Sequence, residues 1–144
     1  MNINWSAASG EFELHRYPKG QHDKSLQAWD SADELLVEHI HDLTLSDDAD
    51  LLLFNDMFGA LTLALANRQL KLITDSYISQ QAILQNCQLN DITPPDILSS
   101  LATLPQANIA VIKLTKNIGL LEFQLEQLAG QKSLDRVIAA GKTT

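Results

Sequence analysis

The middle of the chain contains short apolar runs of the kind that form buried strands. Residues 51–54 (LLLF) form an uninterrupted apolar run, which is typical of a parallel strand that is buried on both faces. Weaker or longer runs of the same character predict further strands at residues 70–74, 97–101, 108–114 and 136–140. Turn residues such as Asn, Asp, Pro and Gly separate these runs from their surroundings. The pattern therefore predicts five strands after residue 50.

Helical segments separate most of these strands. Residues 58–67 have helical composition, residues 77–89 suit a helix that is capped by Ser76, and residues 117–129 suit a helix that ends at Gly130. An alternation of strands and helices with short links requires right-handed crossovers, which place the strands side by side in a parallel sheet. We therefore predict an α/β, Rossmann-like fold, in which a mostly parallel sheet carries helices on both faces.

The first third of the chain has a different pattern. Residues 1–10 are small and polar, and we expect them to be frayed. Residues 12–16 alternate apolar and polar side chains, as a short strand would. A helix is then predicted to start near Asp23 or Ser25, since both residues are good N-caps. Its spacing predicts a buried apolar stripe made of Leu26, Trp29, Leu36, Ile40 and Leu43.

Acidic side chains are concentrated at the start of the chain. The 144 residues carry 18 acidic and 10 basic side chains, which gives a net charge of -8. Residues 1–50 hold eleven of the acids and three of the bases, so the rest of the chain is neutral. A solvated acidic face and a surface for a basic partner both explain this asymmetry, and the sequence leaves the two open. A pI near 4.7 argues against stand-alone binding of nucleic acid through bulk charge.

Simple counts exclude several other classes of protein. Cys87 is the single cysteine, so the chain has no internal disulfide and no cysteine-built zinc site, and its apolar helical surroundings favour a packing role. No apolar stretch approaches the roughly 20 residues of a membrane helix. The first ten residues lack the basic segment and apolar core of a secretory signal. We therefore expect a cytoplasmic domain with no membrane partner.

The turn after residues 51–54 is the place to look for a cofactor, because ligands bind at the carboxyl ends of the strands in such sheets. Nucleotide-binding turns are rich in glycine, which lets the backbone approach the cofactor closely. Here the turn has one glycine, Gly59, which follows Asp56, Met57 and Phe58. Met57 and Phe58 stand where a nucleotide would need access. We therefore interpret Asp56 and Gly59 as remnants of a degenerate site.

Asp75 follows the second predicted strand. An acidic residue at this place often accepts hydrogen bonds from ribose hydroxyls in nucleotide-binding folds. It could also cap the next helix together with Ser76, and we favour this second interpretation. Asp75 is therefore counted with Asp56 and Gly59 as a degenerate position of a cofactor site that we do not expect to function.

A catalytic clamp is missing after the strand over residues 108–114. An enzyme that methylates a nucleic-acid amine would carry Asn or Asp, two prolines and an aromatic residue here, which hold the amine and stack the extruded base. This chain has Leu114, Thr115, Lys116 and Asn117 instead. We therefore predict no catalytic residue.

Two further patterns do not form sites. His39 and His41 are two residues apart, so they diverge by about 200° on a helix and we predict no metal site there. Residues 141–143 (GKT) match the end of a phosphate-binding loop, but the first glycine of that motif would fall on Arg136. The sequence thus predicts neither a metal nor a phosphate-loop nucleotide.

Several short segments together resemble a known family. They are residues 26–34, 55–61, 74–79, 111–116, 120–122 and 136–142. In these segments the chain closely resembles the N-terminal domain of the type G guanine-N(2)-methyltransferases that modify 23S ribosomal RNA. The resemblance runs from about residue 11 to the last residue, and the combination is specific although each segment is short.

The resemblance implies a longer enzyme with two methyltransferase-like domains. In that family the S-adenosylmethionine site and the Asn-Pro-Pro-aromatic motif lie in the C-terminal domain, while the N-terminal domain is a degenerate copy that helps substrate recognition and stability. We therefore expect residues 1–22 to form an arm and residues 23–144 to form a degenerate methyltransferase-like domain, incomplete at its C-terminal end. Its expected partners are its own C-terminal domain and the 23S ribosomal RNA.

Two functional hypotheses follow. The first is a non-catalytic domain of an S-adenosylmethionine-dependent rRNA methyltransferase, which helps to recognise the RNA or stabilises the catalytic domain. The second is a free-standing Rossmann-like domain that binds a small molecule or another protein and has no enzymatic activity. We predict no measurable S-adenosylmethionine binding by this chain, and weak or no RNA affinity because it lacks a basic excess.

Overall fold

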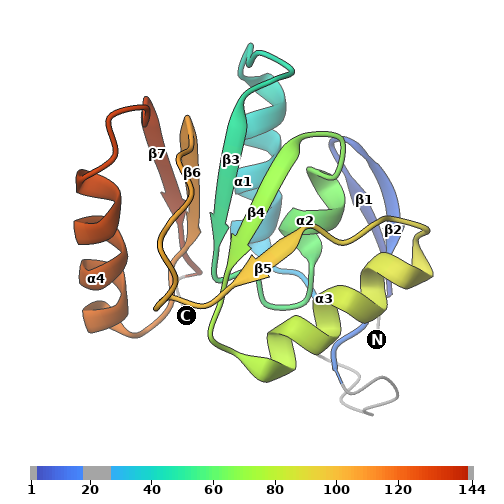
Figure 1. Cartoon of the computed structure of the whole chain (residues 1–144). Helices are drawn as coiled ribbons and strands as arrows, with labels where there is room; N and C mark the ends of the chain where they lie inside the picture. The colour runs from blue at the N-terminus through green and yellow to red at the C-terminus, as the bar shows by residue number, and fades with distance from the viewer. Residues whose placement is uncertain (1–2, 18–26, 143–144) are drawn as a thin grey trace.

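Five parallel strands form the centre of the molecule (Figure 1). The computed structural model describes residues 3–17 and 27–142. The strands lie in the order β5-β4-β3-β6-β7, and every neighbouring pair is parallel. Their bounds are β3 (Asp50–Phe54), β4 (Gln69–Ile73), β5 (Asp96–Leu98), β6 (Ile109–Lys113) and β7 (Arg136–Ala140). The predicted parallel α/β sheet is confirmed, and all five strands lie close to the predicted ranges.

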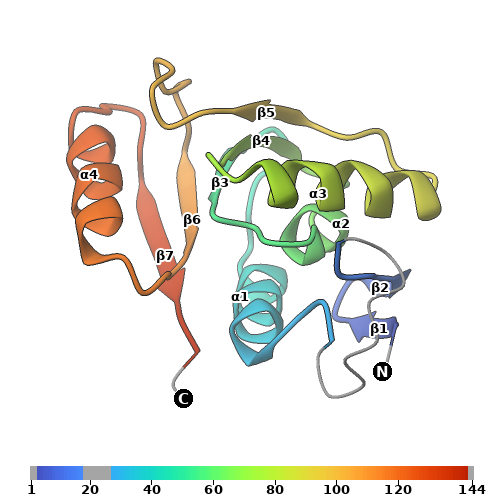
Figure 2. The same ribbon diagram turned by 90° about the horizontal axis from the view of Figure 1, so that it is seen from below.

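Helices cover both faces of this sheet, as predicted (Figure 2). One face carries α1 (Ser31–Asp42), α2 (Ala60–Ala64) and α3 (Tyr77–Leu89). The other face carries α4 (Ile118–Ala129). Successive side chains of a strand point to opposite faces, so Leu51 and Leu53 pack under the first group of helices and Leu52 and Phe54 pack on the side of α4. This two-sided burial explains why β3 is apolar throughout.

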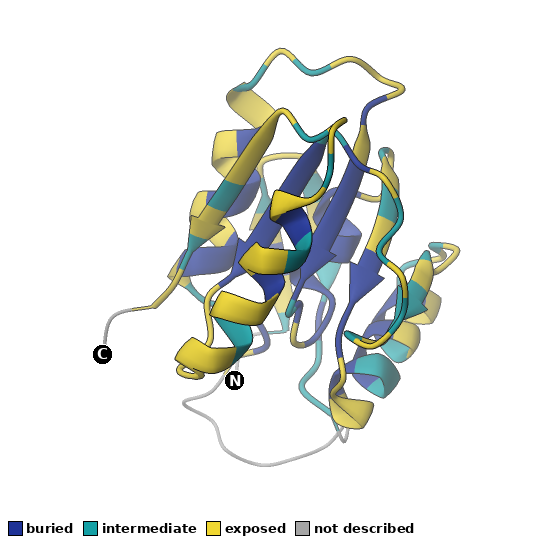
Figure 3. Ribbon diagram, turned by 60° about the vertical axis from the view of Figure 1, so that its left-hand side comes forward, coloured by how far each residue is buried: buried dark blue, intermediate teal, exposed yellow. Residues whose placement is uncertain are grey.

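The two faces are covered to different extents. All five residues of α2 are buried, whereas α4 buries only Gln124 and Leu128 (Figure 3). Residues 99–108 help to cover the α4 side, where Leu104 and Ala107 pack against the sheet. The α4 side therefore exposes apolar side chains, among them Ile118, Phe123 and Leu125. Within the described part of the chain, no helix is long and apolar enough to cross a membrane.

The start of the chain is ordered, and the expectation of a frayed N-terminus was wrong for the described residues. Strands β1 (Asn4–Ala7) and β2 (Gly10–Glu13) form an antiparallel hairpin that packs on the helices α1 and α2. Trp5 is buried and stacks on Trp29, with the ring centroids 5.9 Å apart. A buried indole removes a large apolar area from water, which offsets the conformational entropy lost by a polar segment. The predicted strand over residues 12–16 also begins two residues earlier.

Two side chains at the C-terminal end of α3, one of them the C-cap Asn90, hold the end of this hairpin. The amide of Asn90 accepts the Glu13 N–H at 2.9 Å, and the amide of Asn86 accepts the His15 N–H at 3.1 Å. Both amides also donate to the carbonyls of the same two residues. These contacts join segments more than 70 positions apart, so no local pattern predicts them. The predicted boundary between residues 22 and 23 lies outside the described residues and stays a prediction.

Two predicted helices have different bounds. The first was expected to start at Asp23 or Ser25, which lie outside the described residues, but residues 27–30 are not helical and α1 begins at Ser31. Asp30 is its N-cap, and its carboxylate accepts the N–H groups of Ala32 and Asp33. The helix predicted over residues 58–67 is shorter and fully buried as α2, and tight turns follow it.

Trp29 is buried, as predicted, although it precedes α1 instead of lying on it.

The other two helices, α3 and α4, match the prediction closely. Ser76 caps α3 by accepting the Ser79 N–H, and Asn117 caps α4 by accepting the Leu120 N–H. Polar residues at these two positions satisfy N–H groups that have no partner within the helix.

Candidate functional site

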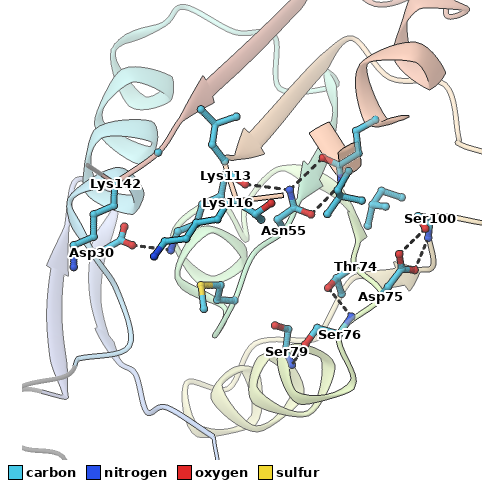
Figure 4. A pocket seen from close by; sticks show the side chains of 17 residues that line it. Asp30, Asn55, Thr74, Asp75, Ser76, Ser79, Ser100, Lys113, Lys116 and Lys142 are labelled. Carbon is cyan, nitrogen blue, oxygen red and sulfur yellow. Dashed lines mark hydrogen bonds and ion pairs between the residues drawn. The ribbon is translucent and has the colours of Figure 1, made fainter. Parts of the chain in front are cut away.

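A pocket of about 920 Å³ opens at the carboxyl edge of the sheet, beside the ends of β3, β4 and β6 (Figure 4). The chain runs outward from β3 to β4 and β5 and then returns to β6, so β3 and β6 flank the point where the strand order reverses. Ligands of open parallel sheets bind at this point, where the two crossovers diverge. The lining residues are Asp30, Asn55, Met57, Ile73, Thr74, Asp75, Ser76, Ser79, Ser100, Lys113, Leu114, Thr115, Lys116, Leu120, Gln124, Gly141 and Lys142.

Asp56 does not face this pocket. Its side chain is buried, and its Oδ2 accepts the Thr62 N–H at 2.9 Å and the Thr62 hydroxyl at 2.6 Å. Its Oδ1 accepts the Leu61 N–H at 3.4 Å. The carboxylate therefore satisfies N–H groups at the start of α2, and its two oxygens are already occupied by the protein.

Gly59 keeps a backbone conformation that other residues avoid. Its φ is 101°, in the left-handed region, and a Cβ here would lie 3.5 Å from the Cα of Ile83 on α3. Asn55 is also left-handed, with a φ of 69°, which asparagine tolerates better than most residues. The turn after β3 thus has two left-handed positions, and one of them is the single glycine that the sequence pointed to.

Met57 and Phe58 lie differently relative to the pocket. Phe58 is buried in the core and lines a smaller adjoining hollow instead of the pocket itself, and Arg16 lies over its ring with the guanidinium carbon 4.9 Å from the centroid. Met57 is half exposed and lines the pocket. The space beside the turn therefore remains open, with one flexible thioether side chain at its edge.

Asp75 is held by a partner that the sequence did not indicate. Its Oδ1 accepts the Ser100 N–H at 2.8 Å, and its Oδ2 accepts the Ser100 hydroxyl at 2.5 Å. The interpretation of Asp75 as a helix cap was wrong, since Ser76 alone caps α3. Asp75 instead ties the end of β4 to the segment after β5, and each of its carboxylate oxygens accepts one hydrogen bond from Ser100.

The floor of the pocket is an amide pair that bridges three elements. Asn55 donates to the backbone carbonyl of Lys113 at 3.1 Å and to the Gln124 side chain at 3.2 Å, and Gln124 donates back to Asn55 at 2.9 Å. The pair joins the ends of β3 and β6 to α4. It explains why α4 buries a polar residue, and it predicts a rigid floor, because both amides have satisfied partners.

A buried ion cluster lies next to the pocket. The Lys113 ammonium is 2.9 Å from Oδ2 of Asp33 and 3.3 Å from Oδ2 of Asp30. Asp33 is 1% exposed and Lys113 is 6% exposed, so both charges are removed from water. The same two aspartates form the capping box of α1, in which Asp33 accepts the Asp30 N–H at 3.0 Å. We name these three residues the ion cluster. It joins the start of α1 to the end of β6.

The ion cluster shifts the pKa values of its members. Burial, reinforced by the nearby Asp56 carboxylate, raises the pKa of Asp33 to about 6 although Lys113 opposes it. Asp30 is less buried, and the Lys113 ammonium together with backbone N–H groups holds its pKa below the usual value against its desolvation. Burial lowers the pKa of Lys113, but the attraction of Asp33 and Asp30 outweighs it and the pKa lies above its usual value. The Oδ1 atom of Asp33 has no hydrogen-bond partner among the described residues.

Sequence reasoning missed the ion cluster. The available signal was Lys113 itself, a charged residue at the end of an apolar strand, because such a charge needs a partner when the strand is buried. The partners lie about 80 positions away, at the start of α1. Their identity could not be derived from spacing, since only the tertiary fold brings them to β6.

Several other predicted positions lie apart from the pocket floor. Leu114, Thr115 and Lys116 line the pocket mouth, in the place where the catalytic clamp was sought. His39 and His41 are exposed on α1, and the described residues contain no group of three potential metal ligands. Cys87 is buried in the core, and burial raises the pKa of its thiol to about 11, which keeps it protonated.

The sheet order and the pocket at its carboxyl edge define a Rossmann-like fold of the methyltransferase type. A solved structure with this fold is the 16S rRNA N2 G1207 methyltransferase of T. thermophilus in complex with AdoMet and guanosine. It superposes with a TM-score of 0.63 and 20% sequence identity, over 81% of this chain and 33% of that chain.

Sequence comparison identifies the family. The model of the RLMG N-terminal domain matches residues 2–144, and the chain belongs to this family. The ribosomal RNA large subunit methyltransferase G of Erwinia tasmaniensis is 44% identical over 133 residues, which are 90% of this chain and 35% of that protein. The protein of the same name from Yersinia enterocolitica is 43% identical over 90% of this chain and 33% of its own length. The chain thus spans about a third of the length of these curated relatives. The resemblance found in the sequence is confirmed.

Proposed function

We propose that the chain is a non-catalytic domain of an S-adenosylmethionine-dependent guanine-N(2)-methyltransferase that acts on 23S ribosomal RNA in the cytoplasm. Its role would be to help recognise the RNA or to stabilise the catalytic domain. The names of the relatives support the reaction class, and the share of their length that this chain spans supports a further domain. That domain would hold the cofactor and the catalytic residues.

The observation that carries this proposal is how the side chains after β3, β4 and β6 are used within the chain itself. The carboxylate of Asp56 is committed to the start of α2, and the carboxylate of Asp75 is committed to Ser100. Asp56 is buried away from the pocket, and the orientation of the Asp75 carboxylate is set by Ser100 and not by a ligand. The segment after β6 offers Leu114, Thr115 and Lys116 to the pocket, which provide no amide and no ring to hold a guanine amine.

The exposed side of α4 supports a stabilising role toward a catalytic domain. Ile118 is 71% exposed, and Phe123 and Leu125 are also exposed on the same short helix. β7 lies at the edge of the sheet, and its residue Val137 is exposed. Exposed apolar side chains that gather on one element mark interaction surfaces. We place the contact with the catalytic domain on this side of the molecule.

The open pocket favours the alternative function, a free-standing Rossmann-like domain that binds a small molecule or another protein without enzymatic activity. A volume of about 920 Å³ is large enough for a small-molecule ligand, and its polar groups converge on one edge of the sheet. The alternative and the first proposal differ in what happens to methylation when the domain is removed from a longer relative.

The direct test is a titration of this chain with S-adenosylmethionine by calorimetry, followed by an assay of methyl transfer to unmodified 23S rRNA. We expect no binding heat and no transfer, while the longer Erwinia tasmaniensis relative serves as the positive control. Micromolar cofactor binding by this chain would contradict the proposal. In the relative, removal of the segment that matches this chain should reduce rRNA methylation, and unchanged methylation would favour the alternative.

A further inference from the structure

The pocket is one part of a longer hollow along the carboxyl edge. A second hollow of about 300 Å³ adjoins it, and the two share Asp30, Met57, Lys113 and Lys142. We call the two together the carboxyl-edge groove. The second hollow is also lined by Arg16, which follows the N-terminal hairpin, and by Phe58, which lies in the turn after β3. The groove thus runs from the start of α4 to the hairpin, past the exposed thioether of Met57.

The charges that line the groove are unlike those of the chain as a whole. The chain has a net charge of -8, yet Lys116 and Lys142 line the groove and form no ion pair with any described residue. Of the two acids of the lining, Asp30 is paired with Lys113, whereas Asp75 accepts two hydrogen bonds from Ser100 and keeps its negative charge on the wall opposite the lysines. The groove therefore presents two ammonium groups without ion-pair partners among the described residues. Most of the acids of the chain lie outside the groove.

The walls of the groove differ in chemistry (Figure 4). Lys113, Lys116 and Lys142 lie on one side, and the hydroxyl residues Thr74, Ser76, Ser79 and Ser100 lie on the other. Met57, Leu114 and Leu120 add apolar surface between the two sides. An anion next to a flat, uncharged group with polar edges fits such walls, because the ammonium groups attract the anion and the apolar surface covers the ring.

We propose that the carboxyl-edge groove binds one nucleotide, with its phosphate at Lys116 and Lys142 and its base against Met57 and Leu120. The assignment rests on the proposed function, since it names the part of the domain that would meet RNA. A free mononucleotide and an unpaired residue of an RNA strand share this chemistry. S-adenosylmethionine differs, because its anion is a carboxylate instead of a phosphate and it also carries sulfonium and ammonium charges that the two lysines repel.

The geometry limits what can enter. Two ammonium groups at one mouth neutralise one or two phosphates, so the interaction is local and weak compared with a basic surface. A paired base cannot reach the pocket, because its edge and faces are covered within the duplex. The groove therefore selects unpaired nucleotides, in agreement with the acidic character of the rest of the chain.

The test is a titration of the isotope-labelled chain followed by NMR chemical shifts. The probes are guanosine monophosphate, a six-nucleotide unpaired RNA, the same RNA in a duplex, and S-adenosylmethionine. We expect the first, the second or both to shift signals of Met57, Lys116, Leu120 and Lys142, and the other two to leave them unchanged. The mononucleotide alone would identify a free nucleotide as the source, and the unpaired RNA alone would identify a strand. Absence of shifts with both, or equal shifts with S-adenosylmethionine, would overturn the proposal.

The lysines are tested with a matched pair of double variants. With the six-nucleotide RNA, Lys116→Gln with Lys142→Gln should weaken binding by about tenfold and reduce the salt dependence of the binding constant by about 0.7 logarithmic units per tenfold salt, because one phosphate contact is lost. Lys71→Gln with Lys132→Gln makes the same charge change outside the groove and should leave binding within about twofold of the parent. Equal losses in the two double variants would show a diffuse charge effect and would refute the site.

Met57 provides a second test that does not depend on the lysines. It is 44% exposed, and Leu84 on α3 is 41% exposed outside the groove, so both tolerate a polar residue. Met57→Glu should abolish the shifts because it replaces the apolar surface against the base with a charged side chain, and Leu84→Glu should preserve them. The NMR titration and the methyl-transfer assay test different proposals. Absence of nucleotide binding would refute only the nucleotide site in the groove. Methyl transfer by this chain would refute only the proposed non-catalytic function.

Discussion

Lys113 and Lys116 are three positions apart at the end of β6, yet their surroundings are opposite. Lys113 is buried and held by two aspartates within 3.3 Å, whereas Lys116 lies at the mouth of the pocket with no ion-pair partner among the described residues. The first charge joins α1 to the sheet. The second is available to a ligand. The comparison teaches that a shift of three positions along the chain separates a lysine that is buried and paired from one that lines the pocket without an ion pair among the described residues.

The largest expected effect comes from removing the buried ammonium. Lys113→Met leaves Asp33 buried without a counter-charge, so we expect the free energy of unfolding to fall by about 3–5 kcal/mol. Urea unfolding at neutral pH measures this change. Lys71→Met is the control, since Lys71 is an exposed lysine on strand β4 of the same sheet and its replacement should cost less than about 0.5 kcal/mol. Similar losses in the two variants would contradict a structural role of the ion cluster.

A smaller effect is expected in the pH dependence of stability. The pKa of Asp33 is about 6 in the folded chain against an ordinary value of 3.8, so the folded state holds a proton that the unfolded state has released between these values. Stability from this group is therefore present below about pH 4 and is lost as the pH rises through 6. Across this window the loss amounts to about 3 kcal/mol.

Asp33→Asn removes this titration and serves as the comparison. The free energies of unfolding of the parent and the variant are measured from about pH 4 to about pH 7.5. As the pH rises, the parent should lose the stability that this group contributes and the variant should not, so the stability of the variant relative to the parent should increase. At alkaline pH, the stability depends on Lys113. Its pKa is raised in the folded chain, so the stability that it contributes is lost only at strongly alkaline pH. A difference between parent and variant that stays constant over the acid window would contradict the raised pKa of Asp33.

The smallest expected effect on stability comes from the lysines of the groove. Replacement of Lys116 and Lys142 together by Gln should change the free energy of unfolding by less than about 0.5 kcal/mol, because no described residue pairs with either side chain. The same urea unfolding experiment measures it. A loss close to that of Lys113→Met would mean that the groove lysines are structural, and the comparison between the two kinds of lysine would fail.

The elements that sequence reasoning predicted well are those in which local pattern and burial agree. The strand over residues 51–54 is apolar because both faces of β3 are covered, and the helix over residues 77–89 has its predicted cap and bounds. The failures lie where distant contacts decide the outcome. The first ten residues looked frayed until Trp5 was seen to stack on Trp29, and Asp75 looked like a cap until Ser100 was seen to hold it.

The candidate site was predicted in its location but not in its content. The carboxyl edge follows from the alternation of strands and helices, so the region around Asn55, Asp75 and Lys116 could be found from the sequence. The sequence also identified Gly59 as the single glycine of the turn. It could not show that Phe58 turns into the core and leaves the pocket open, because the direction of a side chain in a turn depends on what packs against it.

The sequence by itself determined the parallel α/β fold, the family and the absence of a glycine-rich turn, because periodicity, composition and short motifs are local properties of the chain. Only the tertiary structure decided which charges are buried. It brought Asp30 and Asp33 to Lys113 from a distant part of the chain, and it left Lys116 and Lys142 without ion-pair partners among the described residues at the pocket mouth. The physical reason is that burial and pairing depend on which segments the fold brings together, and these contacts fix both the pKa values and the charge of the groove.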